Sequence, residues 1–257
     1  MTHRTLIVTS TMFLLLLAIR TNLVQAQQYA IRSIDVPGAA ATEISDTNKS
    51  GEIVGCYTVT GFNAGFPGVV LANATFKLVK YPKAAATCVM GVSNDGKMAG
   101  WYADTSGNTH GFLLAAKTYT SLDYPGAVFT QATKVNNSGV VVGAYFDGTT
   151  DHGFKWQSGT FTTIDYPGAS KTFAYGINDS GTIVGNYTSG TFHGFSLSSG
   201  TFTSIDYPGA AGTGATAINN AGRRPILGLQ PQLHLRIQCP DPLTNRRARR
   251  SECPTWS

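Results

Sequence analysis

An eighteen-residue motif recurs along the chain, and this repetition is the feature that most constrains the fold. The segment HGFKWQSGTFTTIDYPGA spans residues 152–169, and close copies occupy residues 110–127 and 193–210. Tandem copies fold as a series of similar units that pack on their neighbours. A residue present in every unit is explained more simply by folding than by one active site. The repeat therefore predicts architecture better than it predicts chemistry.

Three landmarks fix the frame of the repeat: a turn Gly in N-(D/N)-S-G, the His of H-G-F, and the Asp of I-D-Y-P-G-A. The Asp position precedes the next turn Gly by 16 residues in all five instances, and the His position precedes the next Asp position by 13. Only the spacing from turn Gly to His changes, through 16, 14, 13 and 12 residues. One loop per unit therefore varies in length on a constant frame.

The hydrophobic pattern predicts four short β-strands per unit and no helix after the N-terminus. Tandem four-stranded modules of about 42 residues are typical of β-propeller blades, so we expect an all-β, propeller-like array. Small residues in the first strand suit the crowded edge beside a central channel. The predicted domain spans residues 27–222, with four complete units and a partial fifth: residues 40–83, 84–127, 128–169, 170–210 and 211–222.

The N-terminus is typical of an exported protein. Residues 1–26 combine early basic residues, an apolar stretch and a small-x-small pattern before Gln27, which predicts a secretory signal peptide. No later segment is long and apolar enough to span a membrane. We expect a secreted, periplasmic or cell-surface protein. Residues 28–39 match a fourth strand with no first three strands before them, and in a propeller such an orphan strand completes the last blade.

The chain from residue 223 onward differs abruptly in composition. Seven of the ten Arg and five of the eleven Pro lie there, and this tail carries the whole net charge of +5. We predict a non-repeat, disordered basic tail over residues 223–257, and we interpret a faint repeat-like Ile-Leu-Gly at residues 226–228 as chance. Without interleaved aromatic residues the tail does not indicate nucleic-acid binding. The last blade is then incomplete, so the ring is expected to be incomplete or closed by partners.

Four cysteines lie outside the repeat pattern, and none has metal-ligand spacing. Cys56 and Cys88 fall in neighbouring units. In an oxidising compartment they would form a disulfide, whereas a packed or exposed free thiol is equally compatible with their positions.

The repeated His and Asp are interpreted as structural pairs that tie the two strands of a hairpin. Three pairs are predicted: His110 with Asp123, His152 with Asp165, and His193 with Asp206. The unit with Pro67 at the His position also has Lys80 at the Asp position, so both partners are lost together. No catalytic constellation, metal site or cofactor motif is found, and we expect no catalytic residues, metal or cofactor.

With the units aligned, the chain resembles the HAF-type extracellular repeat of secreted bacterial proteins, here in an HGF version. The resemblance rests on I-N-D-S-G-x-I-V-G-x-Y followed by H-G-F, covers residues 40–222, and departs at Pro67 and after Gly222. It implies export and a propeller-like β fold. The resemblance implies no catalytic residues.

These observations favour a binding or scaffolding module of unknown ligand, with carbohydrate or an extracellular protein as the partner class. The variable loops and the crossovers between units are expected on one face, where Tyr, Thr and Asn suit such contacts. The candidate binding residues are Tyr124, Tyr166, Tyr207, Phe146 and Asp147; the alternative for the tyrosines is packing between blades. Two other functions stay open: a glycan-active hydrolase or lyase on a propeller scaffold, and a truncated copy with little function.

Overall fold

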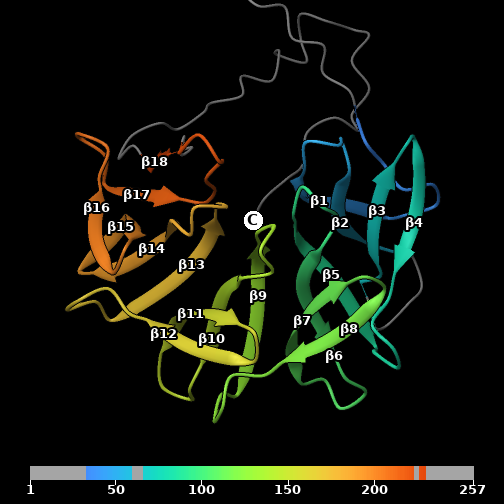
Figure 1. Cartoon of the computed structure of the whole chain (residues 1–257), viewed down its shortest axis with the longest axis horizontal. Helices are drawn as coiled ribbons and strands as arrows, with labels where there is room; N and C mark the ends of the chain where they lie inside the picture. Colours follow the sequence, from blue (N-terminus) through green and yellow to red (C-terminus); the bar gives the residue numbers. More distant parts are fainter. Residues whose placement is uncertain (1–32, 60–65, 223–225, 230–257) are drawn as a thin grey trace, which may run out of the picture. The chain divides into compact units, whose positions relative to one another are not determined.

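Four antiparallel sheets of four strands follow one another along the chain (Figure 1). The computed structural model describes residues 33–59, 66–222 and 226–229. Within each unit the strands pair in chain order, as in β1-β2-β3-β4 and β5-β6-β7-β8. The predicted all-β, propeller-like array of four-stranded units is confirmed. Among the described residues, no helix is long and apolar enough to cross a membrane.

Each strand position recurs from unit to unit. The first strands are β1 (Ala41–Thr47), β5 (Ala86–Val92), β9 (Phe129–Val135) and β13 (Lys171–Ile177). The second strands are β2 (Ile53–Thr58), β6 (Met98–Ala103), β10 (Val141–Phe146) and β14 (Ile183–Ser189). The third strands are β3 (Gly68–Ala72), β7 (Thr109–Ala115), β11 (Asp151–Gln157) and β15 (Thr191–Ser198). The fourth strands are β4 (Thr75–Val79), β8 (Thr118–Leu122), β12 (Thr160–Ile164) and β16 (Thr201–Ile205).

A β-bulge in every first strand explains the glycine of the Ile-Val-Gly motif in the second strand. In β13 the pairing with β14 skips one residue between Ala174 and Gly176, and the other three first strands do the same. A Cβ on Gly185 would lie 1.9 Å from the carbonyl oxygen of Phe173, and the equivalent glycines are equally crowded. The bulge brings the two backbones so close that only glycine fits.

The hydrophobic core lies between consecutive units. Phe154, from the His-Gly-Phe of the third unit, is fully buried and packs with Leu122 from the fourth strand of the second unit. Phe195 packs in the same way with Ile164, and Phe112 with Val79. Each unit therefore buries its apolar face only when a neighbour is present, as in other repeat proteins.

Polar contacts join the units at both ends of the first strands. At the crossover, the backbone N–H that follows each repeat Asp position donates to a Thr hydroxyl six residues later, at 2.8–3.0 Å; the acceptors are Thr42, Thr87, Thr130, Thr172 and Thr213. At the turns, the N–H of Asn94 donates to Asn137 Oδ1, and that of Asn137 donates to Asp179 Oδ1. The turn residues thus form a chain of hydrogen bonds that runs from unit to unit.

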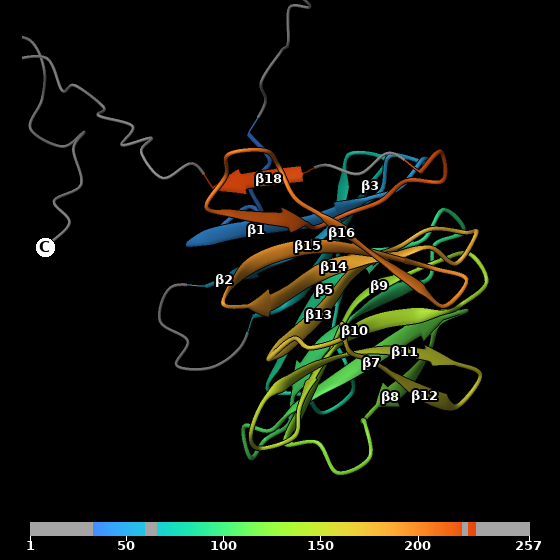
Figure 2. The ribbon, with the colours of Figure 1, turned by 90° about the vertical axis from the view of Figure 1, so that its left-hand side faces the viewer.

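The fifth unit contributes two strands to the described residues. Strand β17 (Gly212–Ala215) pairs with β18 (Ile226–Leu229), and β17 also lies against β15 of the fourth unit (Figure 2). The faint Ile-Leu-Gly similarity at residues 226–228 thus lies in a paired strand. No further strand of this unit is described, and the described strands do not close into a ring. The predicted signal peptide, residues 28–32 of the predicted orphan strand and residues 230–257 lie outside the described residues, and residues 33–39 form no strand.

Candidate functional site

The structure brings each repeated His together with the Asp that lies 13 residues later. The Nδ1 atom of His110 lies 2.6 Å from Asp123 Oδ1, that of His152 lies 2.9 Å from Asp165 Oδ1, and that of His193 lies 2.7 Å from Asp206 Oδ1. Each His is the second or third residue of a third strand and each Asp directly follows the fourth, so the hairpin register sets the contact. The interpretation of these residues as structural pairs stays a proposal.

The second nitrogen of each His ring faces the variable loop of its own unit. His110 Nε2 lies 3.5 Å from Asp104, His152 Nε2 lies 3.3 Å from Asp147, and His193 Nε2 lies 2.8 Å from the hydroxyl of Thr191. A protonated His with two carboxylate neighbours donates to both. The His therefore links the constant hairpin to the variable loop.

Local hydrogen bonds set the charge state of the loop carboxylates. The side-chain amide and backbone N–H of Asn108 lower the pKa of Asp104 to about 2. The hydroxyl of Thr149 and the backbone N–H groups of Thr150 and Thr149 lower the pKa of Asp147. Burial alone would lower the pKa of His152, but Asp165 and Asp147 outweigh burial and raise it. The loops of the second and third units thus each hold an ionised carboxylate beside the His.

A tyrosine stack joins the second, third and fourth units each to the unit before it. The ring of Tyr124, from the Tyr-Pro-Gly of the second unit, lies 3.6 Å from that of Tyr145 in β10, at an interplanar angle of 5°. Tyr145 stacks in turn on His152 at 5.0 Å. Tyr166 and Tyr187 repeat the geometry at 3.6 Å. One face of Tyr124 and one of Tyr166 are thus covered by the next unit.

The other candidate binding residues lie in different settings. Tyr207 is 51% exposed, and Phe146 stacks on Phe129 at 5.7 Å. Asp147 lies on the loop after β10, where it accepts hydrogen bonds from the N–H groups of Thr149 and Thr150. The loop also contacts the next crossover, because the Thr150 hydroxyl donates to the carbonyl of Ser170. Loop and crossover therefore share one end of the unit.

A cavity of about 480 Å³ opens between the first strands, and none of the candidate site residues predicted from the sequence lines it. Its wall includes the bulge residues Ser45, Met90, Thr133 and Tyr175, together with the ion pair of Asp46 and Lys134. The bulge residues occupy one repeat position yet differ in every unit. The cavity is thus lined by side chains that differ between units at the same repeat position.

The signal for this cavity was present in the sequence. Five residues before each turn Gly the chain has, in order, Asp46, Gly91, Lys134, Gly176 and Ala217. Two opposite charges interrupt a position otherwise occupied by small residues. Because the first strands face a common centre, these charges meet although 88 residues separate them.

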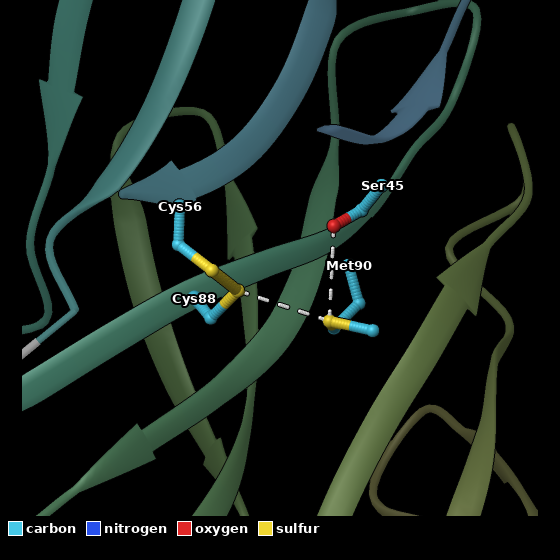
Figure 3. Close-up of a disulfide and its surroundings, with 4 residues drawn as sticks. All are labelled: Ser45, Cys56, Cys88 and Met90. Atoms are coloured by element: carbon cyan, nitrogen blue, oxygen red, sulfur yellow. Dashed lines mark hydrogen bonds between the residues drawn. A yellow bond between two sulfur atoms is a disulfide. The ribbon is translucent and has the colours of Figure 1, made fainter. Parts of the chain in front are cut away.

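Cys56 and Cys88 form a disulfide that joins β2 of the first unit to β5 of the second (Figure 3). Of the two alternatives in the sequence, the structure shows the bonded one. Figure 3 also shows the sulfur of Met90 close to both the disulfide and the Ser45 hydroxyl, 3.9 Å from Cys88 Sγ and 3.9 Å from Ser45 Oγ. The disulfide thus lies behind the cavity wall. In the described part of the chain, no group of three or more His, Cys, Asp and Glu side chains is arranged to hold a metal ion.

Comparisons with known proteins give distant structural likenesses. No family model matches the chain, and no curated protein matches it. TolB from Acinetobacter baumannii has a TM-score of 0.49 at 12% identity over 74% of this chain, which spans 54% of the TolB chain. A triple mutant of AofleA from Arthrobotrys oligospora has a TM-score of 0.47 at 15% identity, over 78% of this chain and 69% of its own. For a fucose-specific lectin from Aleuria aurantia the values are 0.41 and 11%, over 72% and 68%.

Proposed function

We propose that this chain is an exported binding or scaffolding module of the HAF-type repeat class, with a contact face formed by its variable loops. The leader-like residues 1–26 and the repeat motif support export and class. The observation that carries the binding function is that repeated residues make contacts within the fold, whereas non-repeated residues lie in the exposed loops. The repeated His, Asp and Thr and the side chains of Tyr124 and Tyr166 are engaged within the frame, whereas the loops differ in length and sequence from unit to unit.

The loops lie at the crossover end of the units. Residues 104–108 join β6 to β7, and residues 147–150 join β10 to β11. The backbone N–H of Val128 donates to the carbonyl of Phe146 at 2.7 Å, so the crossover from the second unit lies beside the end of β10. Adjacent loops on a rigid frame are the usual arrangement of binding surfaces. Their Asp, Thr, Asn and Ser side chains suit polar contacts with carbohydrate or protein.

A loop exchange tests this function. Replacing residues 147–150, Asp-Gly-Thr-Thr, by the residues 104–108, Asp-Thr-Ser-Gly-Asn, keeps the Asp that faces the His. The thermal midpoint should therefore change little while the ligand profile changes. Wild type and variant are compared on glycan and peptide arrays and against a panel of glycosidase and lyase substrates. An identical array profile for the two proteins counts against the loop face, and substrate turnover by the wild type would replace the binding function by an enzymatic one.

A further inference from the structure

We infer that the central cavity is a second binding site, which takes the vicinal diol of a neutral sugar. Its wall is formed by the first strands and the turns that follow them, at the opposite end of these strands from the variable loops. The site is therefore separate from the loop face and does not depend on the function proposed for it.

The ion pair of Asp46 and Lys134 leaves one donor and one acceptor unused. An ammonium group carries three N–H donors. Lys134 directs two of them to Asp46 Oδ2 and to the carbonyl of Val92, the latter at 3.2 Å. Asp46 Oδ2 also accepts the N–H of Val92 at 2.7 Å, whereas Oδ1 accepts no hydrogen bond among the described residues. A free N–H thus lies beside a free carboxylate oxygen.

Two adjacent hydroxyl groups match this arrangement. One hydroxyl donates to Asp46 Oδ1 while its neighbour accepts from Lys134, and each retains the opposite capacity for the rest of the wall. Hydrogen bonds to charged groups are among the stronger ones in proteins. Both side chains are about four-fifths buried, with exposed fractions of 20% and 21%, so water competes weakly for them.

The charges on the wall favour a neutral ligand. The charged residues that line the cavity are Asp46 and Asp179, and Lys49 and Lys134, so their charges cancel. An anion attracted to Lys134 would lie beside Asp46, and a cation attracted to Asp46 would lie beside Lys134. A polyol meets neither repulsion.

An aromatic residue supplies the second part of a sugar site. Tyr175 lines the cavity from β13, and its ring stacks on Phe173 at 6.0 Å. Its hydroxyl has no hydrogen-bond partner in the described part of the chain. Aromatic rings pack on the C–H faces of pyranoses while a phenol supplies a hydrogen bond. The volume of about 480 Å³ lies within the range of small-ligand sites.

The methionines allow a direct test by NMR with ¹³C-methyl methionine. Met90 lines the cavity, whereas Met98 is 8% exposed and packs in the core between the first two units. The disulfide-bonded, full-length secreted protein is titrated separately with D-mannose, D-galactose, D-glucose and sodium acetate. At least one sugar should shift the Met90 signal in a saturable way while Met98 stays unchanged. Failure of all three sugars, or a response to acetate alone, overturns the site.

Variants of the ion pair then locate the diol. The double substitution Asp46→Asn with Lys134→Met removes both charged partners without adding volume, and should weaken the affinity for the sugar roughly tenfold or more. The Tyr175→Phe variant removes only the free hydroxyl and should also weaken sugar binding. It is measured in place of the double variant if that variant does not fold. Wild-type affinity in whichever folded variant is measured contradicts the proposal. The loop exchange should leave the Met90 response intact, which separates this site from the loop face.

Discussion

The junction between the third and fourth units and the junction after the fourth unit carry the same sequence, Ile-Asp-Tyr-Pro-Gly-Ala, in different surroundings. At the interior junction Ile164 is 4% exposed and Tyr166 stacks on Tyr187. At the terminal junction Ile205 is half-buried and Tyr207 is 51% exposed. The residue paired with Thr213 is Gly228, where the preceding unit pairs Thr172 with Tyr187. The Ile and Tyr side chains of the motif are thus buried only where the next unit packs against them.

The crossover itself forms in both places. The N–H of Tyr166 donates to Thr172 at 3.0 Å, and that of Tyr207 donates to Thr213 at 2.8 Å. Backbone geometry is therefore set locally by the Pro-Gly turn and the Thr hydroxyl. Side-chain burial requires the neighbouring unit, so stability in this array is expected to depend on the junctions.

The largest difference in unfolding free energy between equivalent substitutions at the two junctions is expected for the isoleucines. Ile164→Ala should lower the free energy of unfolding by about 2–5 kcal/mol, because it leaves a cavity in a closed core. Ile205→Ala, at the same repeat position, should lower it by less than half as much, since part of the side chain is already in water. Urea unfolding of both variants gives the two values. Equal losses would mean that the terminal junction is as well packed as the interior one.

A smaller difference in unfolding free energy is expected for substitutions of the two tyrosines. Tyr166→Ala removes a stacked ring and should lower the free energy of unfolding by roughly 2–3 kcal/mol. Tyr207→Ala should change it by about 0.5 kcal/mol or less, as for other exposed positions. Thermal unfolding of the two variants in parallel measures the contrast. A large loss for Tyr207→Ala would show that its ring is covered in solution, and would make the exposed terminal junction an incorrect description.

The sequence was sufficient to predict what is local and periodic. The hydrophobic pattern and the turn residues predicted the four strands of each unit, and the constant offsets of 16 and 13 residues fixed the frame in which they repeat. The contact between each His and its Asp was predicted in the same way, from the register of one hairpin. The array, the turns and these side-chain neighbours could therefore be placed without coordinates.

Contacts that depend on the bulges and on the arrangement of the units around a common centre could not be predicted in this way. The bulge occurs in every first strand, so it changes no offset between units, and the spacing does not reveal it. Ser45, Met90, Thr133 and Tyr175 share one repeat position but no common residue type. Asp46 and Lys134 meet only because the first and third units face the same cavity. Cys56 and Cys88 each occur once at their repeat positions, so the pattern carries no information on their pairing.

The smallest contrast between the interior and terminal units concerns pH. His152 contacts two carboxylates, Asp165 and Asp147, and stacks on Tyr145, whereas His193 contacts one carboxylate and the hydroxyl of Thr191. Burial alone would lower the pKa of His152, but the carboxylates raise it above the value of about 6.5 of an unfolded chain. The stabilisation from protonated His152 is therefore complete below about pH 6.5 and is lost as pH rises through the higher folded pKa. Asp147 has a lowered pKa, so its own contribution is present above about pH 3.9 and is lost only in acid.

The substitution Asp147→Thr replaces the loop carboxylate near His152 by a hydroxyl group and should reduce this pH dependence. Between about pH 6 and pH 8 the wild type should lose more unfolding free energy than the variant, and the difference should be small because the pair is partly exposed. Urea unfolding at both pH values measures the difference, and the reciprocal Thr191→Asp variant should lose more than the wild type over the same interval. If all three proteins show the same change with pH, Asp147 does not stabilise the protonated His152, and the His joins the hairpin through Asp165 alone.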